Sequence, residues 1–81
     1  MEINKDIISR EIDKECYLID PKRRILHTFN ETGNFIFKLI SKKHTPDEII
    51  NKISEEFEID KKEAEKDLND FISKLKENGI I

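Results

Sequence analysis

The chain has 81 residues, of which 36% are hydrophobic and 41% are charged. A chain of this length forms one small domain, residues 1–81, and buries only about 60–65% of the surface that its unfolded form exposes. It has room for one core, but not for a core plus an enclosed active site. Every uncharged apolar stretch is far shorter than the roughly 18 residues of a membrane span. From the polar, mixed-charge N-terminus we expect no signal peptide.

The net charge of −3 is unevenly distributed along the chain. Residues 1–20 carry a charge of −3, residues 21–44 carry +5, and residues 45–81 carry −5. A positive centre between acidic flanks indicates a local basic patch and not a globally basic nucleic-acid binder. The alternative is that Lys and Glu simply solvate a small, Ile-rich domain. The single cysteine, Cys16, cannot form an internal disulfide, so we expect a reducing, cytoplasmic setting.

The first half of the chain predicts three short strands. Weak alternation marks residues 8–12, a β-favouring run follows at 16–19, and alternation returns at 25–29. Asp20-Pro21 opens a turn between the last two runs, and Lys22-Arg23-Arg24 forms its exposed tip. Short polar links join all three runs, so we expect an antiparallel meander.

The second half predicts three helices. Five of the seven residues 34–40 are apolar, which predicts a helix buried around most of its circumference after the capping Asn30. Thr45, Pro46 and Glu48 form a capping box that starts a second helix ending near Phe57. A third helix begins after Asp60 in the same way and ends before Gly79. Its apolar stripe consists of Ala64, Leu68, Phe71, Ile72 and Leu75.

Three strands followed by three helices predict an α+β fold of the winged-helix-like type, with a three-stranded antiparallel sheet. Such a sheet has two edges. An exposed edge presents unpaired N–H and C=O groups, which can template an added strand.

No residue pattern indicates catalysis. Cys16, His27 and His44 lack metal-ligand spacing, and the chain has no Ser-His-Asp pattern, nucleophile elbow or P-loop. We expect His27 to have a structural or partner-contacting role, and Cys16 to be a small buried apolar residue. We therefore predict that the protein is not an enzyme and requires no cofactor or metal.

The winged-helix shape makes a DNA-binding regulator the alternative function. In such folds one helix enters the major groove and presents basic or amide side chains. Residues 61–70 contain four acids and three lysines, which would meet phosphates poorly. DNA binding would have to depend on the basic residues at 22–24 and 42–43. A third alternative is an interaction domain whose exposed edge pairs with a second copy; we expect a monomer or a weak homodimer.

Several segments, taken in order, resemble the PqqD family. They are Phe29-Asn30-Glu31-Thr32-Gly33, the apolar helix 35–40, the helix start Thr45-Pro46-Asp47-Glu48-Ile49-Ile50, the aromatic Phe57, and a last helix closing on Gly79-Ile80-Ile81. The resemblance covers roughly residues 15 to 81. Phe29 stands where Leu is common, and Ser41-Lys42-Lys43 replaces the usual Asp/Asn-Gly turn; neither change harms the fold. The Met1 start and the Gly79-Ile80-Ile81 end favour a standalone protein.

This resemblance implies a RiPP recognition element, a small non-catalytic domain that binds the leader segment of a ribosomally made precursor peptide. Such domains present the leader to a modifying enzyme, often a radical SAM protein or a leader peptidase. The leader adds as a strand to the edge of the third strand, in a groove against the last helix. This mode takes affinity from main-chain hydrogen bonds and specificity from side-chain pockets.

The peptide-binding residues are predicted from this arrangement. The wall of the groove is expected at Leu68 and Ile72, with Glu65 and Asn69 on its rim, although Leu68 and Ile72 are core residues in any version of this fold. Lys22, Arg23 and Arg24 either attract an acidic leader or form a solvated turn. The predicted edge comprises Arg24, Ile25, Leu26, His27 and Thr28.

Overall fold

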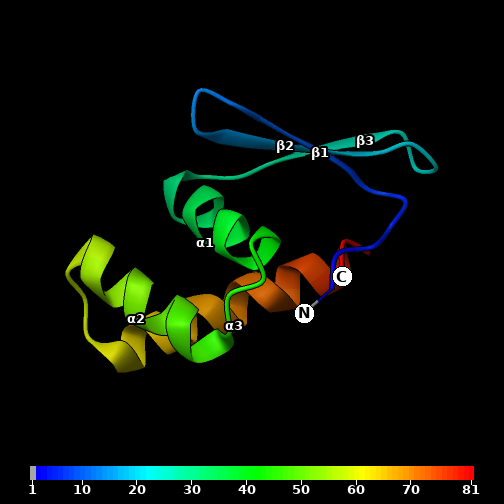
Figure 1. Ribbon diagram of the computed structural model, residues 1–81. Helices are drawn as coiled ribbons and strands as arrows, with labels where there is room; N and C mark the ends of the chain where they lie inside the picture. Colours follow the sequence, from blue (N-terminus) through cyan, green and yellow to red (C-terminus); the bar gives the residue numbers. More distant parts are fainter. Residues whose placement is uncertain (1) are drawn as a thin grey trace.

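Three strands precede three helices in the computed structural model, which describes residues 2–81 (Figure 1). The sheet covers α1, and α2 and α3 lie on the other side of that helix. The elements are β1 (Ile8–Ile12), β2 (Glu15–Asp20), β3 (Ile25–Thr28), α1 (Glu31–Ser41), α2 (Pro46–Phe57) and α3 (Lys61–Glu77). The predicted α+β fold is confirmed. Among residues 2–81, no helix has the length and apolar character needed to span a membrane.

The sheet is an antiparallel meander in the order β1-β2-β3. Cys16, Leu18 and Asp20 are buried on its helix-facing side, as the alternation of side chains along a strand requires. Leu18 lies opposite His27, and Asp20 lies opposite Ile25. His27 and Ile25 therefore share this inner face, while Leu26 lies on the outer face.

The turn between β2 and β3 is held by Asp20. One carboxylate oxygen of Asp20 accepts hydrogen bonds from the backbone N–H groups of Lys22 and Arg23, both at 3.1 Å. Arg24 has a φ of 57°, in the left-handed region. A residue with this backbone conformation belongs to a turn and not to an extended strand. Arg24, the first residue of the predicted edge 24–28, therefore lies outside the strand.

The third strand also ends one residue earlier than predicted. Phe29 leaves the sheet after Thr28 and turns its ring into the core, where it stacks on Phe37 with the ring centroids 5.5 Å apart. Its carbonyl oxygen accepts a hydrogen bond from the side chain of Asn34 at 3.4 Å. The alternation that predicted a strand at position 29 therefore reflects burial against α1.

The predicted helix starts are all confirmed. The side-chain oxygen of Asn30 accepts from the Gly33 N–H at 2.8 Å, and that of Asp60 accepts from the Glu63 N–H at 2.8 Å. Thr45 and Glu48 form a full capping box, with Pro46 in the first turn of α2. These caps satisfy backbone N–H groups that a helix start would otherwise leave unpaired.

The core is built around α1, and a buried amide joins that helix to the sheet. Asn34 is 7% exposed, and its side-chain oxygen accepts the backbone N–H of Cys16 at 3.0 Å. Cys16 is buried as predicted, and this burial raises the pKa of its thiol. At the other end of the chain Gly79 has a φ of 70°, and the buried Ile80 folds back to cover the end of α3.

Candidate functional site

The free edge of β3 is unpaired backbone. β3 pairs only with β2, and within residues 2–81 no other backbone group bonds to it. In an antiparallel ladder every second residue directs its N–H and C=O groups away from the partner strand. The four-residue strand therefore offers hydrogen-bonding groups to an added strand.

Both ends of β3 are joined to α3 through side chains. Before the strand, Arg23 donates from Nη1 to the backbone oxygen of Asn78 at 3.3 Å. After the strand, the ring of Phe29 meets Phe71 edge-on, with the centroids 5.2 Å apart. The backbones themselves lie further apart, since no Cα atom of β3 is within 8 Å of a Cα atom of α3.

One flank of α3 therefore faces β3. Asp67 and Lys74 stand one helical turn before and after Phe71, and Asn78 stands one turn further on, so all four lie on the same side of the helix. We call the free edge of β3, together with this flank, the edge surface. Two contacts, Arg23 with Asn78 and Phe29 with Phe71, define its two ends.

The inner side chains of β3 lie between these two contacts. Ile25 is 43% exposed, a large fraction for an isoleucine on the helix-facing side of a sheet. His27 is half-buried, and its Nε2 atom is buried without a hydrogen-bond partner among the described residues. An unsatisfied buried polar atom costs free energy, and this atom has almost no exposed surface through which a ligand could pair with it. An extended segment placed here would set alternate side chains against Ile25, His27 and Phe71.

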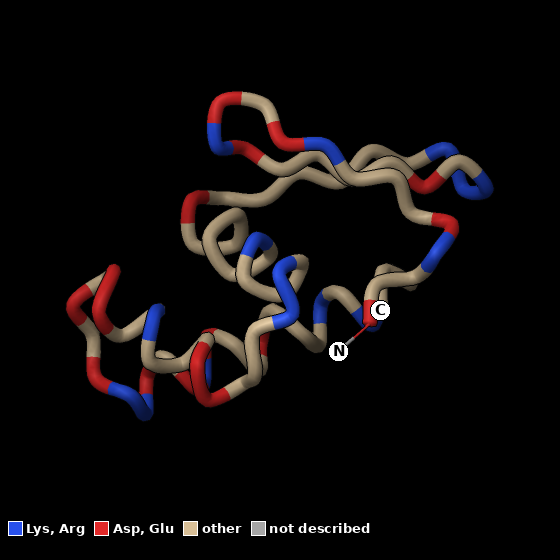
Figure 2. The backbone as a smooth tube through the Cα atoms, viewed as in Figure 1, with Lys and Arg blue, Asp and Glu red and all other residues tan. Residues whose placement is uncertain are grey.

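The basic turn stands at one end of the edge surface (Figure 2). Lys22 is 2.9 Å from Asp6, and this hydrogen-bonded contact raises the pKa of the lysine. Arg23 contacts Asp20 at 3.8 Å as well as Asn78. Arg24 is exposed and forms no ion pair with any described residue. Arg24 is therefore the cation of this turn that is available to a ligand.

The residues predicted to form the wall of the groove border a hollow of their own. Glu65, Leu68, Asn69 and Ile72 border a cavity of about 720 Å³ that no residue of β3 lines. Leu68 is 2% exposed and belongs to the core. Around the axis of α3, Glu65, Asn69 and Ile72 lie on the side of Leu68 that is toward α2, whereas Phe71 lies on the side toward β3. The structure therefore does not bring the two predicted halves of the site together. The other lining residues are Glu2, Pro46, Asp47, Ile50, Lys76 and Ile81.

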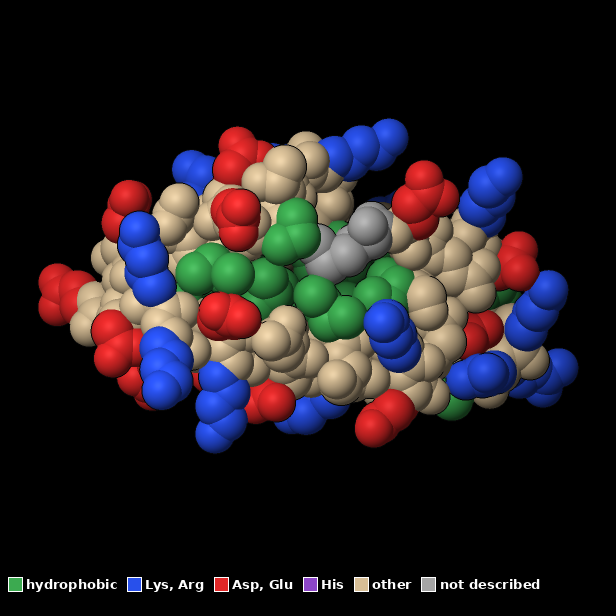
Figure 3. Space-filling model, turned by 90° about the horizontal axis from the view of Figure 1, so that it is seen from below, with side chains coloured by type: hydrophobic (Ala, Val, Ile, Leu, Met, Phe, Trp, Pro, Cys, Tyr) green, Lys and Arg blue, Asp and Glu red, His purple; other side chains and the backbone are tan. Residues whose placement is uncertain are grey.

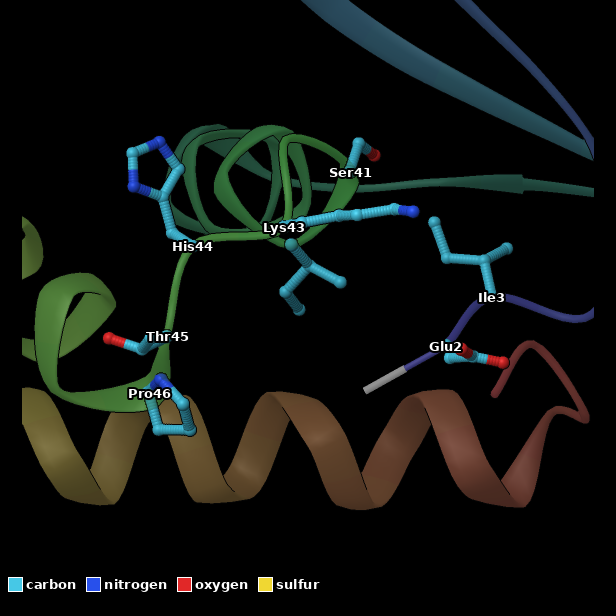
Figure 4. A pocket seen from close by; sticks show the side chains of 8 residues that line it. Glu2, Ile3, Ser41, Lys43, His44, Thr45 and Pro46 are labelled. Atoms are coloured by element: carbon cyan, nitrogen blue, oxygen red, sulfur yellow. The ribbon is translucent and has the colours of Figure 1, made fainter.

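A second cavity continues this hollow. It has a volume of about 580 Å³ and shares Glu2 and Pro46 with the first. Figure 4 shows Lys43 extending toward Ile3 above α3. We call the two cavities together the lower groove. Seen from below, this face carries a band of hydrophobic side chains bordered by charged ones (Figure 3).

The sequence pattern alone does not point to Asp67, Lys74 or Asn78 as site residues, and it indicates Phe71 only as part of the core stripe. Their 4-3-4 spacing is the signal that they share a flank, but the spacing does not say which flank faces the sheet. Within residues 2–81, no group of three or more His, Cys, Asp or Glu side chains is arranged to hold a metal ion.

An open sheet edge beside the last of three helices defines a small α+β protein suited to interaction with an extended segment. Residues 15–81 match the family described as coenzyme PQQ synthesis protein D (PqqD). The chain belongs to this family, as the resemblance noted in the sequence implied.

Two solved structures have the same fold. "TbiB1 in Complex with the TbiA(beta) Leader Peptide" is 28% identical with a TM-score of 0.92, and the alignment covers 99% of this chain and 93% of the other. "Lasso peptide synthetase B1 complexed with the leader peptide" is 24% identical with a TM-score of 0.88, and the alignment covers 98% and 93%. No curated protein matches the sequence.

Proposed function

We propose that the protein is a non-catalytic recognition element that binds the leader segment of a ribosomally synthesised precursor peptide. The free edge of β3 carries this proposal, because a leader in extended conformation can complete its hydrogen bonding. Membership of the PqqD family supports it. So does the similarity to two proteins whose structures contain leader peptides.

In this proposal the leader lies along Ile25–Thr28 as a fourth strand, next to the basic turn at Arg24. Its inward side chains contact Ile25 and His27 from the sheet and Phe71 from α3. Glu65, Asn69 and Ile72 lie outside this path, and Leu68 is buried. The lower groove is therefore a separate surface, and an experiment can tell it from the edge surface.

The proposal extends to the step after binding. The leader is held so that the rest of the precursor reaches a modifying enzyme, either a radical SAM protein or a leader peptidase. This setting is the cytoplasm, where the precursor is made, and it matches a chain whose only cysteine is free and buried. The enzyme would be identified as the one whose turnover of the precursor rises when this protein is added.

The binding proposal is tested by titrating the ¹⁵N-labelled protein with leader segments encoded by short reading frames beside its gene. We expect saturable amide shifts in residues 24–29 and in residues 67–78. A scrambled peptide of the same composition serves as the control. Shifts confined to Glu65, Asn69 and Ile72 would move the site to the lower groove. A protein that binds none of these peptides, but binds duplex DNA in a salt-dependent way, would be a regulator instead.

A further inference from the structure

The two ends of the edge surface carry charges of opposite sign. Arg24 stands at the end where β3 begins, and Lys74 lies on the α3 flank toward that end. Asp67 lies one helical turn beyond Phe71 in the other direction and is half-buried. Glu31, the first residue of α1, follows Phe29 by two positions at that same end. The sign of the charge therefore changes along the path that a bound segment would follow.

Within the part of the chain that the structure describes, none of these four side chains is neutralised by a partner. The ion pairs among residues 2–81 involve neither Arg24 nor Lys74, and neither Asp67 nor Glu31. Their neighbours in the turn, in contrast, are paired: Lys22 with Asp6, and Arg23 with Asp20. The unpaired charges are thus available to a ligand.

The turn that carries Arg24 is held in position before any ligand arrives. Asp20 fixes its backbone, and Arg23 ties it to the end of α3. The N-terminal segment adds a further tie, because Asn4 donates from its backbone N–H to the oxygen of Ile80 at 2.7 Å, while Asp6 pairs with Lys22. Because the turn backbone at Arg24 is already ordered, binding a ligand there costs less conformational entropy.

The spacing of the two charged ends follows from standard geometry. Arg24 and Phe29 flank the four extended residues Ile25–Thr28, so they are at most about 16 Å apart along the strand direction. Asp67 lies one turn of α3 beyond Phe71, a further rise of about 6 Å. An extended peptide covers this span with about five to seven residues.

We propose that the segment recognised at the edge surface carries an acidic side chain beside Arg24 and Lys74, and a basic one beside Asp67 and Glu31. The two charges lie about five to seven residues apart and enclose apolar side chains that face Ile25, His27 and Phe71. The charge pattern then sets the register of the added strand, since main-chain hydrogen bonds alone allow it to slip. This inference rests on the proposed function and adds the chemistry of the peptide.

The test is selection from a phage-displayed library of random twelve-residue peptides, using the whole chain as bait. We expect the selected peptides to share an acid and a base about five to seven positions apart around an apolar centre. Selected peptides that shift the amides of β3 but share no such pattern would overturn the charge proposal and leave the proposed function intact. A library that yields no binder at β3 would overturn both.

A charge reversal sharpens the test. We expect Arg24→Glu to lower the affinity for a peptide selected on the wild type by about threefold to tenfold. The variant loses an exposed ion pair with the acidic side chain of the peptide and gains a repulsion between two carboxylates. Repeated selection on this variant should replace the acid with a base. Lys52→Glu makes the same charge change on an exposed part of α2 and should leave affinity and selection unchanged. Equal effects of the two variants would show a net-charge effect and overturn the proposal; thermal melts verify that both are folded.

Discussion

The two flanks of α3 have almost the same composition but border different kinds of surface. The flank toward β3 carries Asp67, Phe71, Lys74 and Asn78, and the flank toward α2 carries Glu65, Asn69, Ile72 and Lys76. Each has one acid, one amide, one lysine and one large apolar residue. Among the described residues, only the first flank lies beside strand backbone without partners, and that is where we propose that a peptide binds as an added strand. The difference lies in what the helix faces and not in the helix itself.

The largest expected effect separates the core from both surfaces. Leu68 is 2% exposed, so Leu68→Ala leaves a cavity and should lower the free energy of unfolding by about 2–5 kcal/mol. Asn69→Ala, on the exposed neighbouring position, should change it by less than about 0.5 kcal/mol. Urea denaturation of both variants measures the difference. If Leu68→Ala were as stable as the wild type but no longer bound the peptide, Leu68 would be a peptide-binding residue and not a core residue.

The next effect distinguishes the edge surface from the rest of the sheet. Ile25→Asp places an unpaired carboxylate where apolar side chains of the leader would pack, and should weaken leader binding by about thirtyfold or more. Ile8→Asp is a matched control, because Ile8 is 41% exposed and Ile25 is 43% exposed. Calorimetric titration with the same leader measures both affinities.

Ile72→Asp applies the same change to the lower groove, and we expect it to leave the affinity for the leader within about twofold of the wild type. The opposite order, with Ile72→Asp the more damaging, would place the peptide on the other flank of α3. Thermal melts of the three variants identify any loss of binding that comes from unfolding.

A smaller effect concerns the contact that joins β3 to α3. A methyl group at Gly33 would lie 2.9 Å from Cβ of Phe29 and 3.1 Å from a ring carbon of Phe71. Gly33→Ala should therefore destabilise the protein by about 1–2 kcal/mol, although alanine favours a helix by about 1 kcal/mol. Thr32→Ala, one position earlier, lacks this clash. Denaturant melts give the free energies, and a Gly33→Ala protein as stable as the wild type would mean that the two rings separate freely.

The smallest effect lies at the rim of the lower groove. The backbone N–H of Thr45 donates to the Glu48 carboxylate at 2.8 Å and lowers its pKa. Because the pKa of Glu48 is lower in the folded state, the ionised carboxylate stabilises the protein fully when the pH is above the pKa of the unfolded state. This stabilisation is lost as the pH falls through the pKa of the folded state. The melting temperature of the wild type should therefore exceed that of Glu48→Gln at pH 7, and the gap should close in acid.

Lys38 lowers the pKa of Glu11 through a hydrogen bond and its charge, so Glu11 also contributes to the acid dependence of the wild type. The difference in melting temperature between the wild type and Glu48→Gln therefore isolates the contribution of the cap, which the wild-type curve alone does not. Leader affinity at pH 7 should be the same for both proteins, because Glu48 lies outside the edge surface. A gap that persists at low pH would show that the carboxylate charge contributes nothing to the cap.

Local rules predicted most of the fold. Asn30, Thr45 and Asp60 each cap a helix as expected, because a capping side chain bonds backbone groups within three residues of itself. The strands were located to within one or two residues. Two of the displaced boundaries, at Arg24 and Phe29, are positions where the chain enters and leaves the sheet. There a left-handed turn and an aromatic contact with α1 outweigh the alternation of side chains.

The candidate site was only half predictable. In a three-stranded meander both outer strands, β1 and β3, are edges. The sequence pointed to Arg24, Ile25, Leu26, His27 and Thr28, and to the last helix beside them, only through its resemblance to the PqqD family. It could not choose between flanks of equal composition, since helical spacing defines which residues share a side but not what that side meets. The unpartnered Nε2 of His27 is likewise a property of the packed structure.

The sequence by itself determined the order of elements, the helix ends and the uneven charge, because each depends on neighbours a few residues away. Only the tertiary structure decided that Phe71 contacts Phe29 and that Arg23 contacts Asn78. It also decided that Glu65, Asn69 and Ile72 line the lower groove. The reason is that the rotation of α3 is set by packing Ala64, Leu68 and Leu75 into a core shared with every other layer. That rotation places one of two similar flanks beside the open strand.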